Sequence, residues 1–408
     1  MHEPPSHCRT LLIISQVYVP DPAAVGQYMH EAAAAMVQRG HRVIVYTARR
    51  GYDDARQRYA PRETRDGVEI RRLPLASLGK RSMAARLIGG MLFLMQVIVR
   101  GLFVRDLGGV LVSTSPPMAP LAALVLRILR RVPFVFWAMD INPDQMIALG
   151  RTRDGSLPAR VFDWLVRATL RRGAHVVTLD AFMAERLEAK VKLGERISVI
   201  PPWPLEDQLE PVAHADNPFR REHAMDGCFV VMYSGNLSPA HPIETVLEAA
   251  KALRDEPRVL FVFVGGGALR SRIETEALSN VRVLPYQSLD RLRYSLSAAD
   301  VHLVAMGEAM VGIVHPCKVY GAMAVARPVL LLGPARCHAG QLIASHEIGW
   351  RVDHGDVDGA VAVLREMARM DDAALAAMGA RAREAARSSF GKRALCGAFC
   401  DLLERHLC

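Results

Sequence analysis

The stretch FVVMYSGNLSPAHPIETVLEAAKALRDEPRVLFVFVGGG, residues 229–267, decides the fold. It begins with an apolar run, continues through a helical pattern from about Pro242 to Leu253, and ends with a second apolar run and three glycines. Unbroken apolar runs on either side of a helix are typical of parallel strands that are buried on both faces. The stretch therefore predicts an α/β domain built on a doubly wound parallel sheet.

The same alternation runs through the whole chain. The predicted strands are LLIIS, VIVYT, VLVST, FVFWAMD and VVTL in the first half, and FVVMYSG, VLFVFVGGG, VRVLPY, VHLVAM and RPVLLLG in the second. A Pro-rich stretch at 201–219 separates the halves, and 408 residues exceed what one core usually organises. We expect two Rossmann-like domains, 1–205 and 206–390, and a C-terminal helix at 391–408 that can pack back toward the first domain. Because ligands of such sheets bind beyond the carboxyl ends of the strands, we expect the site in a cleft between the domains.

Positive charge is concentrated in the first half of the chain. Residues 1–200 hold 29 Lys+Arg against 17 Asp+Glu, whereas residues 201–408 hold 22 against 25. Such an excess indicates either a solvated Arg-rich surface or an anionic partner, which is nucleic acid, a phosphorylated substrate or an anionic membrane surface. Nucleic acid is disfavoured because no recognition module appears. The N-terminus lacks a signal peptide and the seven cysteines contain no CxxC, so we expect a cytoplasmic protein, peripheral on the inner membrane.

One segment does not follow the alternation of predicted strands and helices. GKRSMAARLIGGMLFLMQVIVRGLFVRD, residues 79–106, is apolar almost all round and carries Arg and Lys at its ends. The uninterrupted part between Arg86 and Arg100 has 13 residues, which is too short to cross a hydrocarbon core of about 30 Å. Two interpretations stay open, an interfacial helix whose cations meet anionic headgroups and a helix buried in the first domain.

Loops after the predicted strands offer backbone amides to an anion. Gly235 and Asn236 follow one strand, Gly265 and Gly266 follow another, and Gly26 lies where the first helix begins. Glycine allows close approach, and amides in such loops bind phosphate groups. Each loop alone fits an ordinary strand-to-helix turn, so it is their combination that predicts a diphosphate site.

The segment VGIVHPCKVY, residues 311–320, precedes a predicted helix and carries the main candidate cation. Pro316 suits a first helical turn, which places Lys318 near the positive end of the helix dipole. His315 and Lys318 can then offset the charge on a departing nucleoside diphosphate. The alternative is a solvated Lys318 with a His315 that caps or packs.

Asp140 ends the predicted strand FVFWAMD. A carboxylate at that end of a strand faces the expected crevice, where it can orient or deprotonate an acceptor hydroxyl. It can equally cap the following turn as an Asx motif, and the sequence leaves both roles open.

Taken together, these motifs resemble the family 4 glycosyltransferases of bacterial surface polysaccharide assembly, particularly those that act on polyprenyl-diphosphate-linked acceptors. The similar stretches include PDPAAVGQYMHEAAAAMVQRGHRVIVYT, FVFWAMDINPDQ, YSGNLSPAHPIETVLEAA and HPCKVYGAMAVARPVL. The resemblance implies a GT-B fold, a nucleotide-sugar donor (a UDP- or GDP-sugar) held mainly by the second domain, and a lipid-linked saccharide acceptor. It also implies retention of the anomeric configuration, with no metal and no cofactor.

Carried onto this chain, the resemblance places Gly26 near the donor phosphates and the acceptor, Asn236 after the first strand of the second domain, and Lys318 on the leaving diphosphate. The candidate catalytic residues are Asp140, His315 and Lys318, and the candidate donor-binding residues are Gly26, Gly235, Asn236, His241, Gly265, Gly266, Glu308, Gly312, Ile313 and Val314. The sequence contains no evident nucleophile backed by a base, so we expect a same-face route in which the leaving phosphate accepts the acceptor's proton.

The chain also departs from the family pattern. The Glu-x7-Glu pair is missing, since Ile313 and Gly321 stand at its two positions, and Glu308 is a candidate substitute for one carboxylate. Asn236 and His241 replace an arginine and a lysine often found after the first strand of the second domain. These departures support a second class of function, a catalytically inactive GT-B partner that binds a nucleotide sugar. A sugar-nucleotide epimerase is a third alternative, which the apolar segment disfavours.

Overall fold

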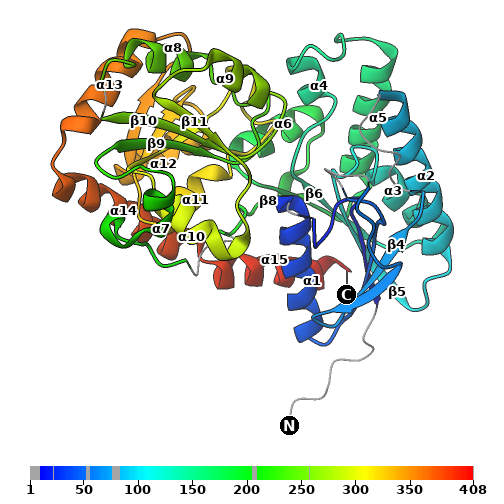
Figure 1. The fold of residues 1–408 in the computed structure, drawn as a ribbon. Helices are drawn as coiled ribbons and strands as arrows, with labels where there is room; N and C mark the ends of the chain where they lie inside the picture. The colour runs from blue at the N-terminus through cyan, green and yellow to red at the C-terminus, as the bar shows by residue number, and fades with distance from the viewer. Residues whose placement is uncertain are drawn as a thin grey trace. The chain divides into compact units, whose positions relative to one another are not determined.

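The computed structural model describes residues 10–21, 23–51, 56–75, 83–204, 209–256 and 258–407. The chain divides into two compact units, Met1–Pro202 with Arg393–Cys408, and Trp203–Lys392. Each unit is a mainly parallel sheet flanked by helices, which confirms the predicted pair of Rossmann-like domains (Figure 1). The boundary expected between 205 and 206 lies outside the described residues, as do residues 79–82 of the apolar segment.

The first unit contains an eight-stranded sheet in the order β3-β4-β2-β1-β5-β6-β7-β8. Its strands are β1 (Thr10–Ile14), β2 (Arg42–Ala48), β3 (Arg62–Arg65), β4 (Val68–Leu73), β5 (Leu107–Ser113), β6 (Phe134–Ala138), β7 (His175–Thr178) and β8 (Ile197–Val199). All neighbouring strands are parallel except β3 and β4, which form an antiparallel pair.

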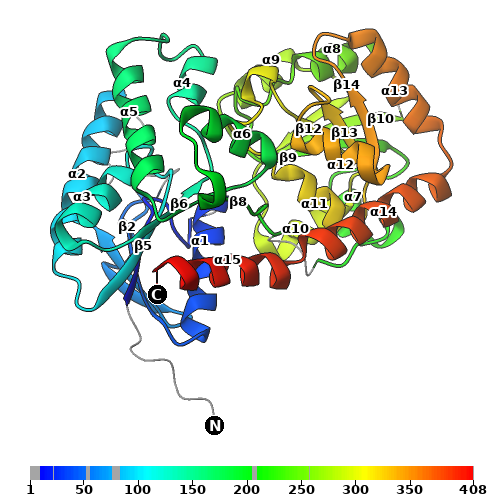
Figure 2. The same ribbon diagram turned by 180° about the vertical axis from the view of Figure 1, so that it is seen from behind.

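Helices cover both faces of this sheet. They are α1 (Ala24–Gln38), α2 (Met83–Leu102), α3 (Pro120–Arg130), α4 (Asp144–Ala148), α5 (Leu157–Arg172), α6 (Ala181–Lys190) and, beyond Lys392, α15 (Lys392–Leu407), with a 3-10 turn η1 (Gly194–Arg196). Helices α2, α3 and α5 lie together on one face, and α1 and α15 lie on the other (Figures 1 and 2). Among the described helices, none is long and apolar enough to cross a membrane.

The C-terminal helix α15 is held to the first unit by both apolar and charged contacts. The ring of Phe399 packs on Trp137 with 4.2 Å between centroids. On the solvent side, the Arg39 guanidinium lies 2.6 Å from a carboxylate oxygen of Asp401 and 2.7 Å from one of Glu404. The end of the chain thus closes one face of the first sheet.

The second unit contains a six-stranded parallel sheet in the order β11-β10-β9-β12-β13-β14. Its strands are β9 (Phe229–Ser234), β10 (Val259–Val264), β11 (Val281–Leu284), β12 (Val301–Ala305), β13 (Val329–Leu332) and β14 (Gly349–Val352). Its helices are α7 (Pro218–Glu222), α8 (Glu244–Ala252), α9 (Arg270–Glu276), α10 (Leu289–Ser297), α11 (Lys318–Ala324), α12 (His338–His346), α13 (Val357–Arg369) and α14 (Asp372–Phe390), with 3-10 turns η2 (His214–Asp216) and η3 (Glu308–Met310).

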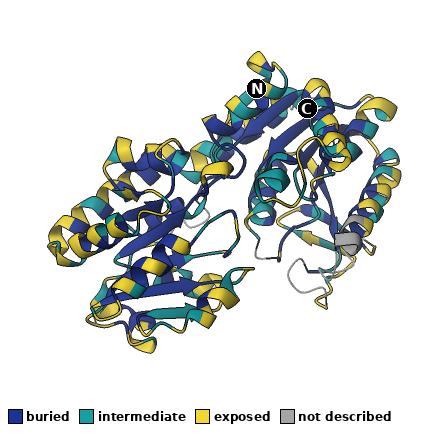
Figure 3. Cartoon of the chain, turned by 90° about the horizontal axis from the view of Figure 1, so that it is seen from above, coloured by how far each residue is buried: buried dark blue, intermediate teal, exposed yellow. Residues whose placement is uncertain are grey.

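Strand β9 shows why this sheet must be covered on both faces. Phe229, Val231 and Tyr233 belong to one buried cluster, whereas Val230 and Met232 belong to a second cluster on the opposite face. Side chains alternate across a strand, so a strand that is apolar at every position needs helices above and below it. In Figure 3 the strands of each unit are buried and the helices expose their outer sides.

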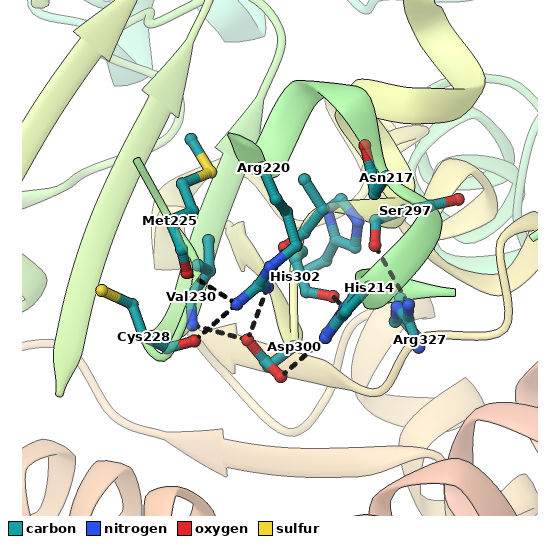
Figure 4. A network of polar contacts seen from close by, with 12 residues as sticks. His214, Asn217, Arg220, Met225, Cys228, Val230, Ser297, Asp300, His302 and Arg327 are labelled. Carbon is teal, nitrogen blue, oxygen red and sulfur yellow. Dashed lines mark hydrogen bonds and ion pairs between the residues drawn. The ribbon is translucent and has the colours of Figure 1, made fainter. Parts of the chain in front are cut away.

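A buried arginine ties the entry of the second unit to its sheet. The Arg220 guanidinium on α7 donates to the carbonyl oxygens of Ala298 (2.6 Å), Met225 (2.8 Å) and Cys228 (2.7 Å), and lies 3.2 Å from a carboxylate oxygen of Asp300 (Figure 4). That same oxygen accepts the amide of Val230 at 2.7 Å. Because Arg220 is buried, each of these partners replaces water that the guanidinium has lost.

Loss of this arginine is expected to destabilise the protein strongly. In Arg220→Ala, Asp300 keeps a partly buried charge without its cation, and three carbonyl oxygens lose a donor. We expect the free energy of unfolding to fall by about 3 kcal/mol or more. Urea unfolding followed by circular dichroism measures the change. The control is Arg221→Ala, whose exposed side chain donates only to Ala215, and an equal loss in both variants would contradict the assignment.

Candidate functional site

The loops that follow β9 and β10 form one continuous backbone surface. The Gly235 amide donates to the carbonyl oxygen of Val264 at 2.8 Å, and the Leu237 amide donates to that of Gly266 at 2.7 Å. Gly235, Gly265 and Gly267 have positive φ angles of 134°, 140° and 127°. This conformation suits glycine, and it lets the two loops lie against each other.

The close contact between the two loops is a second reason, besides the positive φ angles, why Gly265 and Gly267 cannot carry a side chain. A Cβ on Gly265 would lie 2.1 Å from the carbonyl oxygen of Gly235, and a Cβ on Gly267 would lie 2.4 Å from a side-chain oxygen of Asn236. We call residues 235–238 together with 265–267 the glycine shelf. It lies at the carboxyl edge of the sheet, where ligands of doubly wound domains bind.

Lys318, the first residue of α11, lies directly against this shelf. Its Cε would be 2.8 Å from a Cβ on Gly235, and its ammonium lies 5.2 Å from the centroid of the Tyr233 ring. Burial lowers the pKa of this ammonium to about 8. No carboxylate of the described residues forms an ion pair with it, and the Tyr233 ring is one nearby group that favours its charge.

His241 lies close enough to Lys318 for their charges to interact. Burial, with the Lys318 charge as a smaller cause, lowers the pKa of His241 to about 3, so the imidazole is neutral at neutral pH. Its Nδ1–H donates to the carbonyl oxygen of Ala305 at 2.8 Å, which leaves Nε2 as the acceptor. The sequence placed His241 where a cation often stands, and the structure gives it a neutral ring instead.

His315 lies three residues before Lys318 and is engaged inside the unit. Its Nε2 is 3.0 Å from the Tyr320 hydroxyl, which is 2.9 Å from Nε2 of His338. The two imidazole rings also pack together, with 4.6 Å between centroids. The Tyr320 and His338 contacts hold the turn that leads into Lys318, and neither residue was among the sequence candidates.

The remaining candidates of the second unit lie around the same edge. The amides of Ile313 and Val314 both donate to the carbonyl oxygen of Met310, at 2.9 and 3.2 Å, so they serve the turn itself. Gly312 has a positive φ of 69° in that turn. Glu308 is exposed and follows Gly307, whose amide donates to Ala240 in the segment that carries His241.

Tyr286 is a further residue that the sequence analysis did not select. Its side chain is half exposed and lies 3.1 Å from the position of a Cβ on Gly266. An exposed aromatic ring beside a glycine loop is a surface on which a nucleobase can stack. The signal available in the sequence was an aromatic residue at the carboxyl end of the predicted strand VRVLPY, two residues beyond the end of β11.

In the first unit, Asp140 follows β6 in a poorly hydrated position. Burial raises the pKa of its carboxyl group to about 6. The carboxylate accepts a long hydrogen bond of 3.4 Å from the Gln145 side chain. The backbone amide of Asp140 donates to the Thr114 hydroxyl at 3.3 Å. Among the described residues, no backbone amide bonds to this carboxylate, so the alternative of an Asx cap is not what the structure contains. A hollow lined in part by Thr114, Pro117 and Ile141 adjoins it.

Gly26 lies in the first turn of α1 and is buried. A Cβ there would lie 2.8 Å from the Cα atom of Tyr18, so glycine is required for the helix to pass the loop after β1. Its amide donates to the carbonyl oxygen of Ala23 at 3.0 Å. Within the first unit, Gly26 and Asp140 each lie near the carboxyl end of a strand.

Comparisons with known proteins were made on both sequence and structure. Residues 23–203 match the family model described as "Glycosyl transferase 4-like domain", and residues 216–386 match "Glycosyl transferases group 1". The chain is similar to the probable glycosyltransferase WbjE of Pseudomonas aeruginosa, with 25% identity over 64% of this chain and 66% of that protein, just under two thirds. It is also similar to the putative colanic acid biosynthesis glycosyl transferase WcaI of Escherichia coli K12, with 27% identity over 87% of this chain and 91% of that protein.

Several solved structures have the same fold. Sucrose-phosphate synthase from Thermosynechococcus elongatus has a TM-score of 0.75 at 17% identity, covering 97% of this chain and 98% of that one. Anabaena HepE, solved in complex with UDP and glucose, has a TM-score of 0.73 at 14% identity, covering 97% and 100%. WaaG, a glycosyltransferase involved in lipopolysaccharide biosynthesis, has a TM-score of 0.72 at 17% identity, covering 96% and 99%. At these identities the likeness shows the fold, which is the predicted GT-B class.

The glycine shelf is expected to tolerate no added methyl group. Gly265→Ala places a Cβ against the Gly235 carbonyl oxygen, so the loops after β9 and β10 must separate. The control is Gly355→Ala, because Gly355 also has a positive φ, of 87°, but has no neighbour within 4 Å of its added Cβ. We expect about 1 kcal/mol of destabilisation in the control and clearly more in Gly265→Ala. Calorimetric melting temperatures measure both, and equal shifts would show that the close contact is unimportant.

Proposed function

Because the chain belongs to the GT4 family of group 1 glycosyltransferases, we propose that it transfers a sugar from a nucleotide-sugar donor to a lipid-linked saccharide, with retention, in bacterial polysaccharide assembly. The family and the enzyme class are established by the matches over most of the chain. The donor, the acceptor and the stereochemistry are the proposal. The similarity to WcaI, a putative colanic acid biosynthesis transferase, covers 87% of this chain, and it supports a polysaccharide product.

The observation that carries the proposal is the ammonium of Lys318. It lies against the glycine shelf, its pKa is lowered by burial, and it forms no ion pair with a described residue. A desolvated cation gains most from an anion that arrives with the substrate, because a low local dielectric strengthens the attraction. A nucleoside diphosphate beside the shelf supplies that anion.

Other residues of the second unit suit the rest of a nucleotide sugar. Tyr286 offers an exposed ring for the base, and the exposed Glu308 carboxylate offers an acceptor for sugar or ribose hydroxyl groups. The neutral Nε2 of His241 can accept a hydroxyl hydrogen near the diphosphate. HepE was solved with UDP and glucose, so UDP-sugars are the first donors to test, followed by GDP-sugars.

The proposed reaction needs no protein nucleophile. The bond between the anomeric carbon and the diphosphate oxygen breaks as the acceptor oxygen bonds to that carbon on the same face. The acceptor's proton passes to the leaving diphosphate, whose growing charge is offset by Lys318. His315, held by Tyr320, supports the turn that positions Lys318, and Asp140 orients the acceptor hydroxyl.

Removal of the Lys318 charge is expected to depress turnover strongly while leaving the fold intact. We expect kcat of Lys318→Ala to fall by about 10²-fold or more, the size seen when one preorganised charge-stabilising group is removed. Transfer from a labelled UDP- or GDP-sugar panel to a lipid-linked saccharide measures it. The control is Lys251→Ala, since Lys251 is a partly exposed lysine that pairs with Glu248 and Glu276. Near-normal turnover in Lys318→Ala removes its role, and donor binding without any turnover in the unaltered chain indicates an inactive partner subunit.

The pH dependence of kcat/KM is expected to be bell-shaped. Below the pKa of about 6 of Asp140, the carboxylate is protonated and no longer orients the acceptor, so the rate falls as the pH decreases. Above the pKa of about 8 of Lys318, the ammonium loses its charge, so the rate falls as the pH increases. Arginine stays protonated throughout this range, so Lys318→Arg should lose the alkaline limb, and Asp140→Asn should lose the acid limb. Profiles with both limbs unchanged in the two variants would contradict these assignments.

A further inference from the structure

Exposed apolar side chains gather on three neighbouring helices of the first unit. Over the described residues, ten of the fourteen exposed large hydrophobic side chains lie on or beside α2, α3 and α5. They are Ile88, Met91, Met95, Val99 and Phe103 along α2 and just beyond it, Ile128 and Leu129 at the end of α3, and Leu157, Val161 and Trp164 on α5. We call this set, with the three helices that carry it, the outer face. Proteins that act alone in water rarely collect exposed apolar groups in this way.

Helix α2 explains why its sequence looks apolar all round. Phe93, Leu94 and Val97 are buried against the unit. Met95 and Val99, spaced four residues apart, are more than half exposed on another side, and Phe103 just beyond the helix is 80% exposed. The helix therefore has one apolar side that the fold uses and a second apolar side that the fold leaves uncovered.

Helix α5 carries a second stripe. Leu157, Val161 and Trp164 are spaced by four and three residues, so they lie on one side of the helix, and the Trp164 side chain is 59% exposed. Helix α3 packs against both α2 and α5, which places the two stripes on the same helical layer (Figures 1 and 2).

The charges on the outer face are almost all positive. Helices α2 and α3 contain no Asp or Glu, and the single acid of α5, Asp163, pairs with Arg167 and Lys190. The exposed arginines Arg127, Arg171 and Arg172 line a hollow at the ends of α3 and α5, together with Ile128 and Arg196. An apolar stripe beside arginines that form no ion pair with an acid of the described residues complements a surface that is both apolar and negatively charged.

We propose that the outer face docks onto an anionic lipid bilayer. The stripes of α2 and α5 enter the boundary between headgroups and acyl chains, and the arginines at the ends of α3 and α5 bind headgroup phosphates. A second copy of this chain is a poor occupant. A symmetric dimer would bring the same face of each copy together and oppose arginine to arginine, with no free acid of the described helices to separate them. The proposal goes beyond sugar transfer, and it is tested without donor or acceptor.

Vesicle flotation of the full chain tests the docking. We expect binding to vesicles of phosphatidylcholine mixed with phosphatidylglycerol, weaker binding to phosphatidylcholine alone, and release by high salt, which screens charges over about 10 Å or less. Trp164 reports the contact directly, because Trp137 and Trp203 are fully buried and Trp350 is partly buried in the second unit. Its emission should shift to the blue on binding, and Trp164→Phe should remove that shift.

Two double variants separate the contribution of the arginines from that of the apolar side chains to vesicle binding. Arg171→Ser with Arg172→Ser should weaken partition into anionic vesicles by roughly tenfold to thirtyfold. Met95→Gln with Val99→Gln should weaken it by about tenfold or more. The matched controls are Leu289→Gln, since Leu289 is 72% exposed in the second unit, and Arg254→Ser, an exposed arginine of that unit; neither should change binding.

The proposal is overturned if anionic vesicles do not float the chain, or if the controls weaken binding as much as the outer-face variants do. It is also overturned if sedimentation shows a dimer that Met95→Gln with Val99→Gln dissociates while no vesicle binding is seen. Failure of these tests leaves the transfer reaction untouched, because transfer to a detergent-solubilised acceptor is measured separately.

Discussion

The second unit is organised around a cation that the protein itself does not neutralise. Lys318 reaches the shelf because Gly235 has no side chain, and its ammonium lies over the Tyr233 ring instead of beside a carboxylate. Burial disfavours this charge, which is why its pKa is low. A buried ammonium without a carboxylate partner does not stabilise the fold, and in the proposed reaction the diphosphate of the donor supplies the missing negative charge. The shelf glycines have positive φ angles, and burial keeps the His241 ring neutral, so neither feature places a second charge beside Lys318.

Most of the fold could be predicted because a strand that is buried on both faces appears in the sequence as an unbroken apolar run. The run FVVMY, residues 229–233, is apolar at successive positions, and in the structure its side chains alternate between two buried clusters. The Arg220 network could not be predicted in the same way. Two of its partners, Met225 and Cys228, lie close in the chain, but the Ala298 carbonyl and the Asp300 carboxylate are 78 and 80 residues away, and no local pattern links them to Arg220. The periodicity of apolar residues does not show which buried polar groups still need a hydrogen-bond partner after the strands have packed.

In the candidate site, too, some features could be predicted from the sequence and others appear only in the folded structure. Gly235 and His241 were selected from YSGNLSPAH and Lys318 from HPCKVY, and the structure brings the two segments to one edge of the second sheet. The charge state of His241 depends on burial and on its neighbour, so its identity alone gave no indication of a neutral ring. Ile313 and Val314 were selected as donor-binding residues, and in the structure their backbone amides donate to the Met310 carbonyl oxygen within a tight turn. Tyr286 was missed because its importance comes from Gly266, which lies beside it only after the strands have paired.

The helices of the first unit account for the ambiguity of the apolar segment and carry part of the charge asymmetry of the chain. The sequence left α2 open to two interpretations, a buried helix and an interfacial one, and its residues divide between a buried side and an exposed side. A helix on a parallel sheet needs one apolar side, so the second apolar side has no role within the fold. The arginines at the ends of α3 and α5 contribute to the excess of 29 Lys+Arg over 17 Asp+Glu in residues 1–200. Uncovered apolar groups are unfavourable in water, and the proposed contact with an anionic bilayer covers them while it gives the neighbouring arginines headgroup phosphates to bind.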